Sequence, residues 1–300
     1  MTLENVAGFL AKTGKTKLAI EVVDHFSEHS IDLNNYIEVA KAYFAIYEYQ
    51  KAIDACNKSL TLVLDYDKRN EILENMAIIY FHANMQEETL EILKKLPLSS
   101  SVDVIKNDAL QAIEKKKEVS LTGYWSKKLA EEHMFCEELA EWISNYLDKN
   151  KTIHDFGCGN GSYLKYLQSK GFTDLTGYEG EIPNKEFSHI LKQDLSQVFD
   201  VKNKGNVICL EVGEHIPKQY QDIFLDNICN ACDGKLILSW AIRGQYSSSH
   251  VNCLNNEEVI PEVERRGFRY IKDDSIKARN SINPNGCNWF CDTILIYEKL

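Results

Sequence analysis

A glycine-rich turn in the middle of the chain gives the clearest indication of chemistry. The run 154–162 reads His-Asp-Phe-Gly-Cys-Gly-Asn-Gly-Ser, between a strand predicted at 152–156 and a helix predicted at 161–170. Its three alternating glycines are Gly157, Gly159 and Gly161. α/β proteins bind nucleotides at such turns, because glycine admits positive φ and lets the backbone approach a ligand. Asp155 is predicted at the tip of the strand, where a carboxylate can meet a cation or an amine.

The spacing of these glycines separates two classes of nucleotide-binding protein. A dinucleotide site needs Gly-x-Gly-x-x-Gly, and Ser162 stands at the place of its third glycine. The form Asp-x-Gly-x-Gly-x-Gly instead resembles motif I of the class I S-adenosylmethionine (SAM) methyltransferases. The resemblance extends over about residues 120–300 and implies that Asp155 and the three glycines bind SAM. For the glycine run alone, the alternative is a plain turn between a strand and a helix.

Acidic residues follow the next two predicted strands. Glu179 comes after the strand predicted at 173–178, about 20 residues past the glycine turn, where an acid bonds ribose hydroxyls in nucleotide-binding α/β folds. Asp194 and Leu195 follow the strand predicted at 188–192. In the methyltransferase family, the acid at this place accepts a hydrogen bond from the adenine amino group. Each acid alone is equally a solvated loop carboxylate, but their order after the glycine turn favours a SAM site.

A second motif lies at the tip of the fourth predicted strand, 206–211. Glu211, Glu214 and His215 form Glu-x-x-Glu-His, and Glu211 is expected to face the methyl donor. The motif resembles that of ubiquinone-pathway O-methyltransferases and small-RNA 3′-end methyltransferases. In those families these three residues bind a divalent cation together with a histidine from the loop after the fifth strand. His250 lies at the matching place, so the resemblance implies a site for Mg²⁺ or another divalent cation.

The same motif has an interpretation without a metal. In many methyltransferases an acid at this strand tip packs near the donor's amino group, and the neighbouring histidine is a general base. Under both interpretations His215 and Glu211 are the predicted catalytic residues. A metal would hold two neighbouring substrate hydroxyls and lower the pKa of one. We therefore predict O-methylation of a hydroxyl on a sugar, a small metabolite or a nucleic-acid end.

The first hundred residues show a repeated helical periodicity. Small residues recur at Ala7, Ala40 and Ala77, spaced 33 and then 37 residues apart, each with a large apolar residue one turn later. This spacing resembles tetratricopeptide (TPR) repeats, whose unit is a helix hairpin of about 34 residues. A stack of hairpins exposes a concave face that usually binds a protein or peptide. A generic α-bundle is the alternative.

These patterns predict a TPR-like domain at 1–100, a capping helix or linker at 101–119 and a methyltransferase domain at 120–300. The last begins with a loop containing the aromatic pair of 124–125, expected to close over the site or to pack between the domains, and a long helix at 127–147. Strands then alternate with helices, which predicts an α/β fold with a doubly wound, mainly parallel seven-stranded sheet. The last strand is antiparallel in the methyltransferase sheet. The remaining strands are predicted at 235–241, 268–272 and 292–298, with helices at 217–231 and 255–266.

Composition narrows the functions. The net charge of −11 disfavours bulk nucleic-acid binding, and no apolar run or N-terminal signal indicates a membrane or secreted protein, so a cytoplasmic location is expected. Nine cysteines, mostly within apolar runs, are consistent with reduced thiols, and Cys229 and Cys232 are expected to be structural rather than zinc ligands. Two other functions stay open: a protein methyltransferase whose repeats recruit the substrate, and a non-catalytic SAM-binding scaffold.

Overall fold

The computed structural model describes residues 2–30, 32–130, 133–182, 187–247 and 249–300. The chain divides into two compact units, Met1–Glu114 and Lys115–Leu300. The division falls inside the region predicted as a capping helix or linker, near the end of a helix at Ser100–Lys116. No helix in the described parts of the chain is long and apolar enough to cross a membrane.

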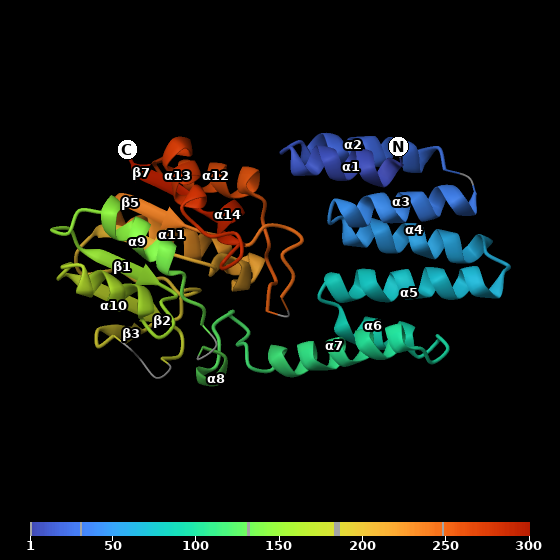
Figure 1. The fold of residues 1–300 in the computed structure, drawn as a ribbon, viewed down its shortest axis with the longest axis horizontal. Helices are drawn as coiled ribbons and strands as arrows, with labels where there is room; N and C mark the ends of the chain where they lie inside the picture. Colours follow the sequence, from blue (N-terminus) through green and yellow to red (C-terminus); the bar gives the residue numbers. More distant parts are fainter. Residues whose placement is uncertain (1, 31, 131–132, 183–186, 248) are drawn as a thin grey trace. The chain divides into compact units, whose positions relative to one another are not determined.

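The first unit is built from helical hairpins (Figure 1). The packed pairs are α1 with α2, α3 with α4 and α5 with α6. The helices are α1 (Leu3–Lys12), α2 (Thr16–Glu28), α3 (Leu33–Ala45), α4 (Tyr49–Leu62), α5 (Tyr66–His82), α6 (Gln86–Leu93) and α7 (Ser100–Lys116). The first helix of every pair begins with a capping side chain, from Thr2, Asp32 and Asp65, that accepts a backbone N–H three residues on.

The turns inside these hairpins repeat with the sequence. Gly14, Tyr47 and Asn84 have φ of 74°, 64° and 61°, and their spacing equals that of Ala7, Ala40 and Ala77. The three alanines are almost completely buried. Because the turns and the core alanines share the same offsets, the first unit contains three equivalent hairpins, which α7 follows. Their assignment to the TPR family stays a prediction.

The second unit contains the predicted seven-stranded sheet, in the order β3-β2-β1-β4-β5-β7-β6. Its strands are β1 (Ile153–Phe156), β2 (Leu175–Glu179), β3 (Ile190–Lys192), β4 (Gly205–Cys209), β5 (Cys232–Leu238), β6 (Phe268–Tyr270) and β7 (Leu295–Lys299). β1 to β5 run parallel and β7 is antiparallel to both its neighbours, as expected. The chain order reverses between β1 and β4, where open α/β sheets bind their ligands.

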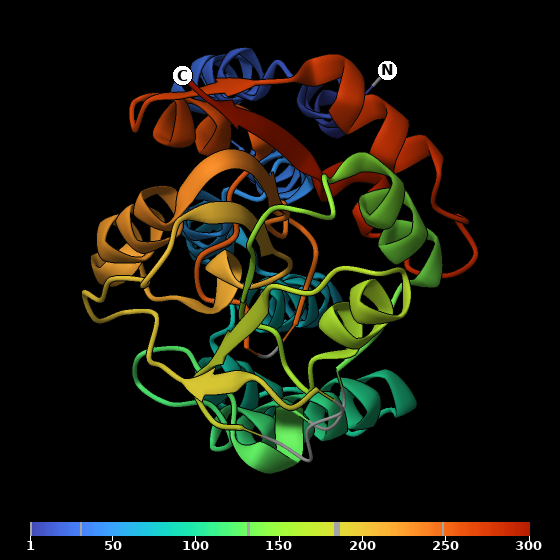
Figure 2. The ribbon, with the colours of Figure 1, turned by 90° about the vertical axis from the view of Figure 1, so that its left-hand side faces the viewer.

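Helices cover both faces of this sheet (Figure 2). One face packs against α9 (Glu137–Tyr146), α10 (Ser162–Ser169) and α13 (Lys272–Asn280). The other packs against α11 (Gln221–Ala231) and α12 (Asn256–Glu264). The fold is therefore doubly wound, and α13, between β6 and β7, was not predicted.

The single helix predicted at 127–147 is wrong. The chain forms α8 (Lys127–Ala130) and α9, separated by irregular residues at 133–136, while 131–132 lie outside the described residues. The break has a tertiary cause, because the Cys136 N–H donates to the Tyr163 hydroxyl at 3.2 Å and the Phe135 ring contacts the Tyr163 ring. These contacts with α10 replace helical ones, so helical periodicity alone does not reveal the break.

The nine cysteines are all free thiols, and seven of them, including Cys229 and Cys232, are buried. In the described parts of the chain, the groups that bring three potential metal ligands together contain no cysteine.

Candidate functional site

The glycine turn joins β1 to α10 as predicted. Gly157 and Gly159 have φ of 75° and 54°. A Cβ on Gly157 would lie 2.4 Å from the Val212 side chain, and one on Gly159 would lie 2.6 Å from the His133 ring. Both positions therefore need glycine for backbone conformation and for close approach.

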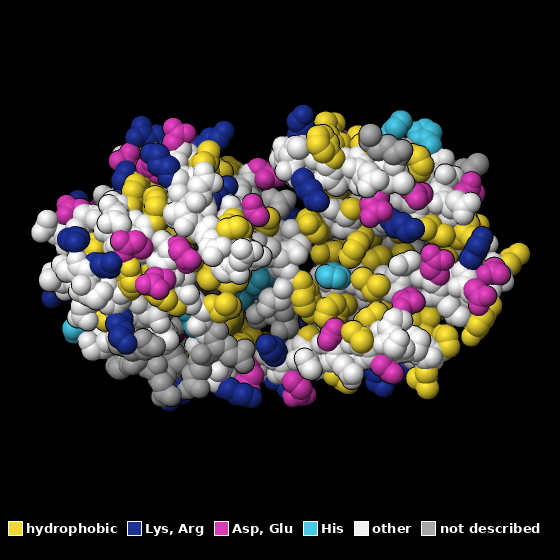
Figure 3. Space-filling view, viewed as in Figure 1, with side chains coloured by type: hydrophobic (Ala, Val, Ile, Leu, Met, Phe, Trp, Pro, Cys, Tyr) yellow, Lys and Arg dark blue, Asp and Glu magenta, His cyan; other side chains and the backbone are white. Residues whose placement is uncertain are grey.

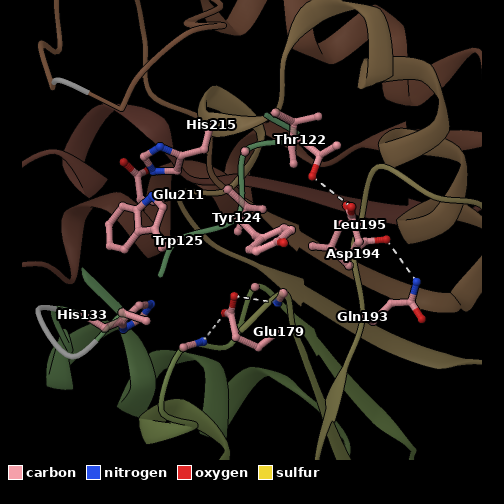
Figure 4. Close-up of a pocket in the computed structure, with 17 residues that line it drawn as sticks. Thr122, Tyr124, Trp125, His133, Glu179, Gln193, Asp194, Leu195, Glu211 and His215 are labelled. Atoms are coloured by element: carbon pink, nitrogen blue, oxygen red, sulfur yellow. Dashed lines mark hydrogen bonds between the residues drawn. The ribbon is translucent and has the colours of Figure 1, made fainter. Parts of the chain in front are cut away.

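A cavity opens at this turn (Figure 4). Its described lining includes seven of the predicted site residues: Gly157, Gly159, Glu179, Asp194, Leu195, Glu211 and His215. They come from the ends of four neighbouring parallel strands, β1 to β4, so the topology gathers residues that are far apart in sequence. The other predicted residues, Asp155, Gly161, Glu214 and His250, lie outside that lining.

The two strand-end acids are held in place by hydrogen bonds. Glu179 is buried, and its carboxylate accepts the backbone N–H groups of Gly159 and Gly180, each at 2.8 Å. Burial raises the pKa of Glu179. Asp194 accepts the Thr122 hydroxyl at 2.9 Å and the backbone N–H of Ser196 at 2.9 Å. Carboxylate oxygens have further lone pairs, so both acids retain capacity to bind ligand hydroxyl or amino groups.

Asp155, predicted at the strand tip, lies inside the sheet. It pairs in register with Gly177 of β2 and Ile208 of β4, and it is buried with Oδ2 lacking a hydrogen-bond partner. Burial, with the nearby charge of Glu179, raises its pKa to about 8. Its burial thus favours the protonated carboxyl, and the part of Asp155 in SAM binding stays a prediction.

Replacing Asp155 with asparagine is expected to remove a pH-dependent loss of stability. The folded-state pKa of about 8 lies above the unfolded value near 4, so the folded state binds the extra proton. Stability therefore falls as pH rises between these values. As pH rises through that window, the free energy of unfolding of Asp155→Asn should increase relative to that of the wild type by up to about 1.4 kcal/mol per pH unit. Urea unfolding at a series of pH values measures it, and parallel curves for both proteins would contradict the argument.

The Glu-x-x-Glu-His motif forms a buried cluster. Ligand atoms of Glu214, His215 and His250 all lie within 4.8 Å of one another. The Glu214 carboxylate is fully buried, and neither of its oxygens has a hydrogen-bond partner. Burial, with the charge of neighbouring Glu211, raises the pKa of Glu214 well above its usual range. Burial also raises the pKa of Glu211 to about 7. Two adjacent buried acids of this kind need either a proton or a cation.

Each histidine of the cluster has its Nδ1 atom bonded to a backbone carbonyl. Nδ1 of His215 donates to the Ser249 carbonyl at 3.0 Å, and Nδ1 of His250 donates to the Gln245 carbonyl at 2.7 Å. A carbonyl only accepts, so Nε2 is the unprotonated nitrogen in each ring. Burial lowers the pKa of both, that of His215 to about 3. Neutral imidazoles oriented by carbonyl acceptors are the form in which histidine binds metals.

Backbone contacts hold the loop that carries His250. The N–H groups of Val251 and Asn252 donate to the Glu214 carbonyl at 2.8 and 2.9 Å, and the Trp240 indole donates to the Asn252 carbonyl at 2.7 Å. Gly213 lies against the face of Trp240, where a Cβ would approach a ring carbon to 2.3 Å. The loop is thereby fixed to the motif itself, so residues 35 apart share one cluster.

The segment before α9 forms the remaining wall. Tyr124 lies against Gly180, where a Cβ would be 2.2 Å from the tyrosine Cβ, and the Trp125 ring meets the His215 ring edge-on at 4.9 Å. The aromatic pair of 124–125 therefore lines the cavity. Thr122 and His133 line it too, and sequence reasoning missed both, because a lone threonine and a lone histidine carry no pattern.

No family model and no curated protein sequence matches the chain. Solved structures similar to it include magnesium protoporphyrin IX methyltransferase from Synechocystis PCC 6803 with bound S-adenosylhomocysteine, at 16% identity over 58% of this chain and 83% of that one (TM-score 0.41). Another is 1,6-didemethyltoxoflavin-N1-methyltransferase from Burkholderia thailandensis, at 11% identity over 68% and 92% (TM-score 0.43). A third is the sugar N-methyltransferase KedS8 from Streptoalloteichus sp ATCC 53650, at 12% identity over 54% and 87% (TM-score 0.40).

Proposed function

We propose that this protein is a SAM-dependent methyltransferase that methylates a hydroxyl group with the help of a divalent cation. The observation that carries the proposal is that two sites of the second unit share a residue. A glycine turn with strand-end acids and a buried Glu-His cluster meet through His215, which belongs to the cluster and lines the cavity. A methyl donor and an acceptor-activating group need this proximity.

The cofactor half of the site comprises the glycine turn, Glu179 and Asp194. SAM, when bound, supplies a sulfonium methyl group for in-line transfer to a nucleophile. Glu179 would accept the ribose hydroxyls and Asp194 the adenine amino group, while Gly157 and Gly159 let the backbone lie against the methionine part. The Thr122 hydroxyl already donates to the Asp194 carboxylate at 2.9 Å. The adenine amino group would therefore bind Asp194 together with this hydroxyl or in its place.

The metal half comprises Glu214, His215 and His250, with Glu211 beside Glu214. Two unpartnered carboxylate oxygens and two neutral imidazoles fit a Mg²⁺, Mn²⁺ or similar ion. Such an ion would bind adjacent substrate hydroxyls and lower the pKa of one of them. Trp125, packed on His215, would keep water from the acceptor oxygen.

The cofactor half is tested by calorimetry of the full chain with S-adenosylhomocysteine, the product formed from SAM. We expect stoichiometric binding, since the turn and both acids are formed. Absence of binding by the folded wild-type protein would overturn the proposal as a whole.

One observation favours protein methylation as the second candidate. The first unit carries a largely apolar groove lined by side chains that include Ile37, Phe44, Ile72 and Ile79, with Lys41 at its wall. Hydrophobic side chains gather on this side of the unit over α3 to α5 (Figure 3). A peptide docked there would make the chain a protein methyltransferase. Incubation with tritiated SAM and a cell extract separates the two candidates, because label enters protein in one case and a small molecule or a nucleic acid in the other.

A further inference from the structure

Two histidines and a glutamate lie together at the C-terminal end of α2, in the first unit. His25, Glu28 and His29 stand at positions i, i+3 and i+4, which are neighbours on the surface of a helix. One potential ligand atom from each side chain lies within 4.8 Å of those of the other two. Figure 3 shows histidine side chains next to each other at the surface over this helix.

Solvent reaches all three side chains. His25, Glu28 and His29 are exposed, whereas Ala19 and Val23 of the same helix are buried in the core of the first unit. An ion can therefore approach from solvent, and the three side chains are free to turn and complete its coordination. This access separates the group from the buried cluster of the second unit.

A backbone contact already orients one of the two imidazole rings. Nδ1 of His29 lies 2.8 Å from the His25 carbonyl. Since a carbonyl only accepts, Nδ1 carries the proton in the neutral ring, and Nε2 keeps a free lone pair. Metal-binding histidines in proteins are fixed by the same kind of contact. The His25 ring lies next to it, with the two ring centroids 4.6 Å apart.

The local charges favour a cation at this place. The last carbonyl groups of a helix carry partial negative charge, and the group lies at the end of α2. Glu28 adds a full negative charge, and the exposed Glu21 adds another, one turn before His25. Two imidazoles with one carboxylate suit Zn²⁺, Cu²⁺ or Ni²⁺, whereas Mg²⁺ and Ca²⁺ prefer oxygen ligands alone.

We propose that His25, Glu28 and His29 form a surface site for a transition-metal dication such as Zn²⁺. Histidines one helical turn apart on one face are a spacing with which helices bind zinc. Three protein ligands leave one position of a tetrahedral zinc shell open to solvent. The ion joins side chains of the last turn of α2 and so stabilises that turn. The site needs neither SAM nor the buried cluster, so it does not depend on the proposed function.

The test is calorimetric titration of the full chain with Zn²⁺, as wild type, His25→Ala and His29→Ala. Each substitution should remove one bound equivalent of Zn²⁺ or weaken its binding at least about tenfold, the lower end of the loss caused even by a residue that only orients a ligand. Glu28→Gln should also weaken binding. Glu21→Gln is its matched control, because it removes the same charge from the same side of the helix without removing a ligand.

The titration is repeated in His215→Ala, so that the buried cluster does not contribute. Zn²⁺ that is bound by His215→Ala and lost in His215→Ala/His29→Ala supports the surface site. Binding that is unchanged in both His25→Ala and His29→Ala overturns it. Equal weakening by Glu21→Gln and Glu28→Gln overturns the three-ligand site, because that result means only a general attraction of charge. If His215→Ala does not fold, the difference in bound equivalents between wild type and His25→Ala decides.

Discussion

Replacing His215 with alanine is expected to slow methyl transfer by about 10²–10⁴-fold and to change the affinity for S-adenosylhomocysteine little. The imidazole belongs to the cluster with Glu214 and His250, and it lines the cavity next to Trp125. The carboxylates that would hold ribose and adenine belong to other residues, Glu179 and Asp194. Turnover of tritiated SAM and calorimetry measure the two effects separately. The exposed His189→Ala, in the same unit, is the control and should behave as wild type.

Metal removal decides between the two roles for His215. A pKa of about 3 makes this histidine a poor proton acceptor at neutral pH, and its unprotonated Nε2 suits a cation. We therefore expect EDTA to abolish turnover and Mn²⁺ or Mg²⁺ to restore it, and Glu214→Gln to prevent the restoration. Turnover that persists in EDTA would leave His215 as a general base and remove the metal from the mechanism.

A second group of potential ligands must be excluded when bound metal is counted. His25, Glu28 and His29 also bring three ligand atoms together, but all three residues are exposed on the first unit. The variant His25→Ala disables this surface group and leaves the buried one intact. If the His25→Ala variant retains metal and the double variant His25→Ala/His215→Ala loses it, the metal is bound by the buried cluster.

The fold was predictable where residues adjacent in sequence determine the local structure. β1 and β4 lie in the centre of the parallel sheet and are buried along their whole length, as central parallel strands usually are. The glycine turn carries its own signal, because Gly157 and Gly159 are required by positive φ and by close approach. These features are set by residues adjacent in sequence, so a single sequence contains them.

The remainder of the site depends on contacts between distant residues. His133 meets Gly159 only because the chain leaves the helical path at 133–136 to pack on Tyr163, and no periodicity marks that departure. Thr122 reaches Asp194 across 72 residues. His250 could be located from motif order, yet its approach to His215 depends on backbone bonds from its loop to Glu214. Tertiary packing determines these positions, and it was visible only in the structure.

Replacing Gly159 with arginine is expected to weaken binding of S-adenosylhomocysteine more than about a hundredfold, a loss of about 2.8 kcal/mol or more. The residue has φ of 54°, and a Cβ there would lie 2.6 Å from the His133 ring. An arginine would therefore displace His133 and fill the cavity beside Glu179. Its guanidinium would also compete with the ribose for the Glu179 carboxylate, because a charge-assisted bond is stronger than one to a hydroxyl.

The matched control for this substitution is Gly171→Arg. Gly171 has φ of 96° at the end of α10, and a Cβ there would meet nothing within 4 Å. Both variants carry the strain of a left-handed non-glycine residue, about 1–2 kcal/mol. Only Gly159→Arg also fills the cavity. The difference in affinity between the two variants therefore measures the effect of blocking the cavity, separately from the effect of backbone strain. Circular dichroism and thermal unfolding verify that both remain folded. If Gly159→Arg binds S-adenosylhomocysteine as well as Gly171→Arg does, the ligand does not lie on the glycine turn, and the cofactor half of the site must be placed elsewhere.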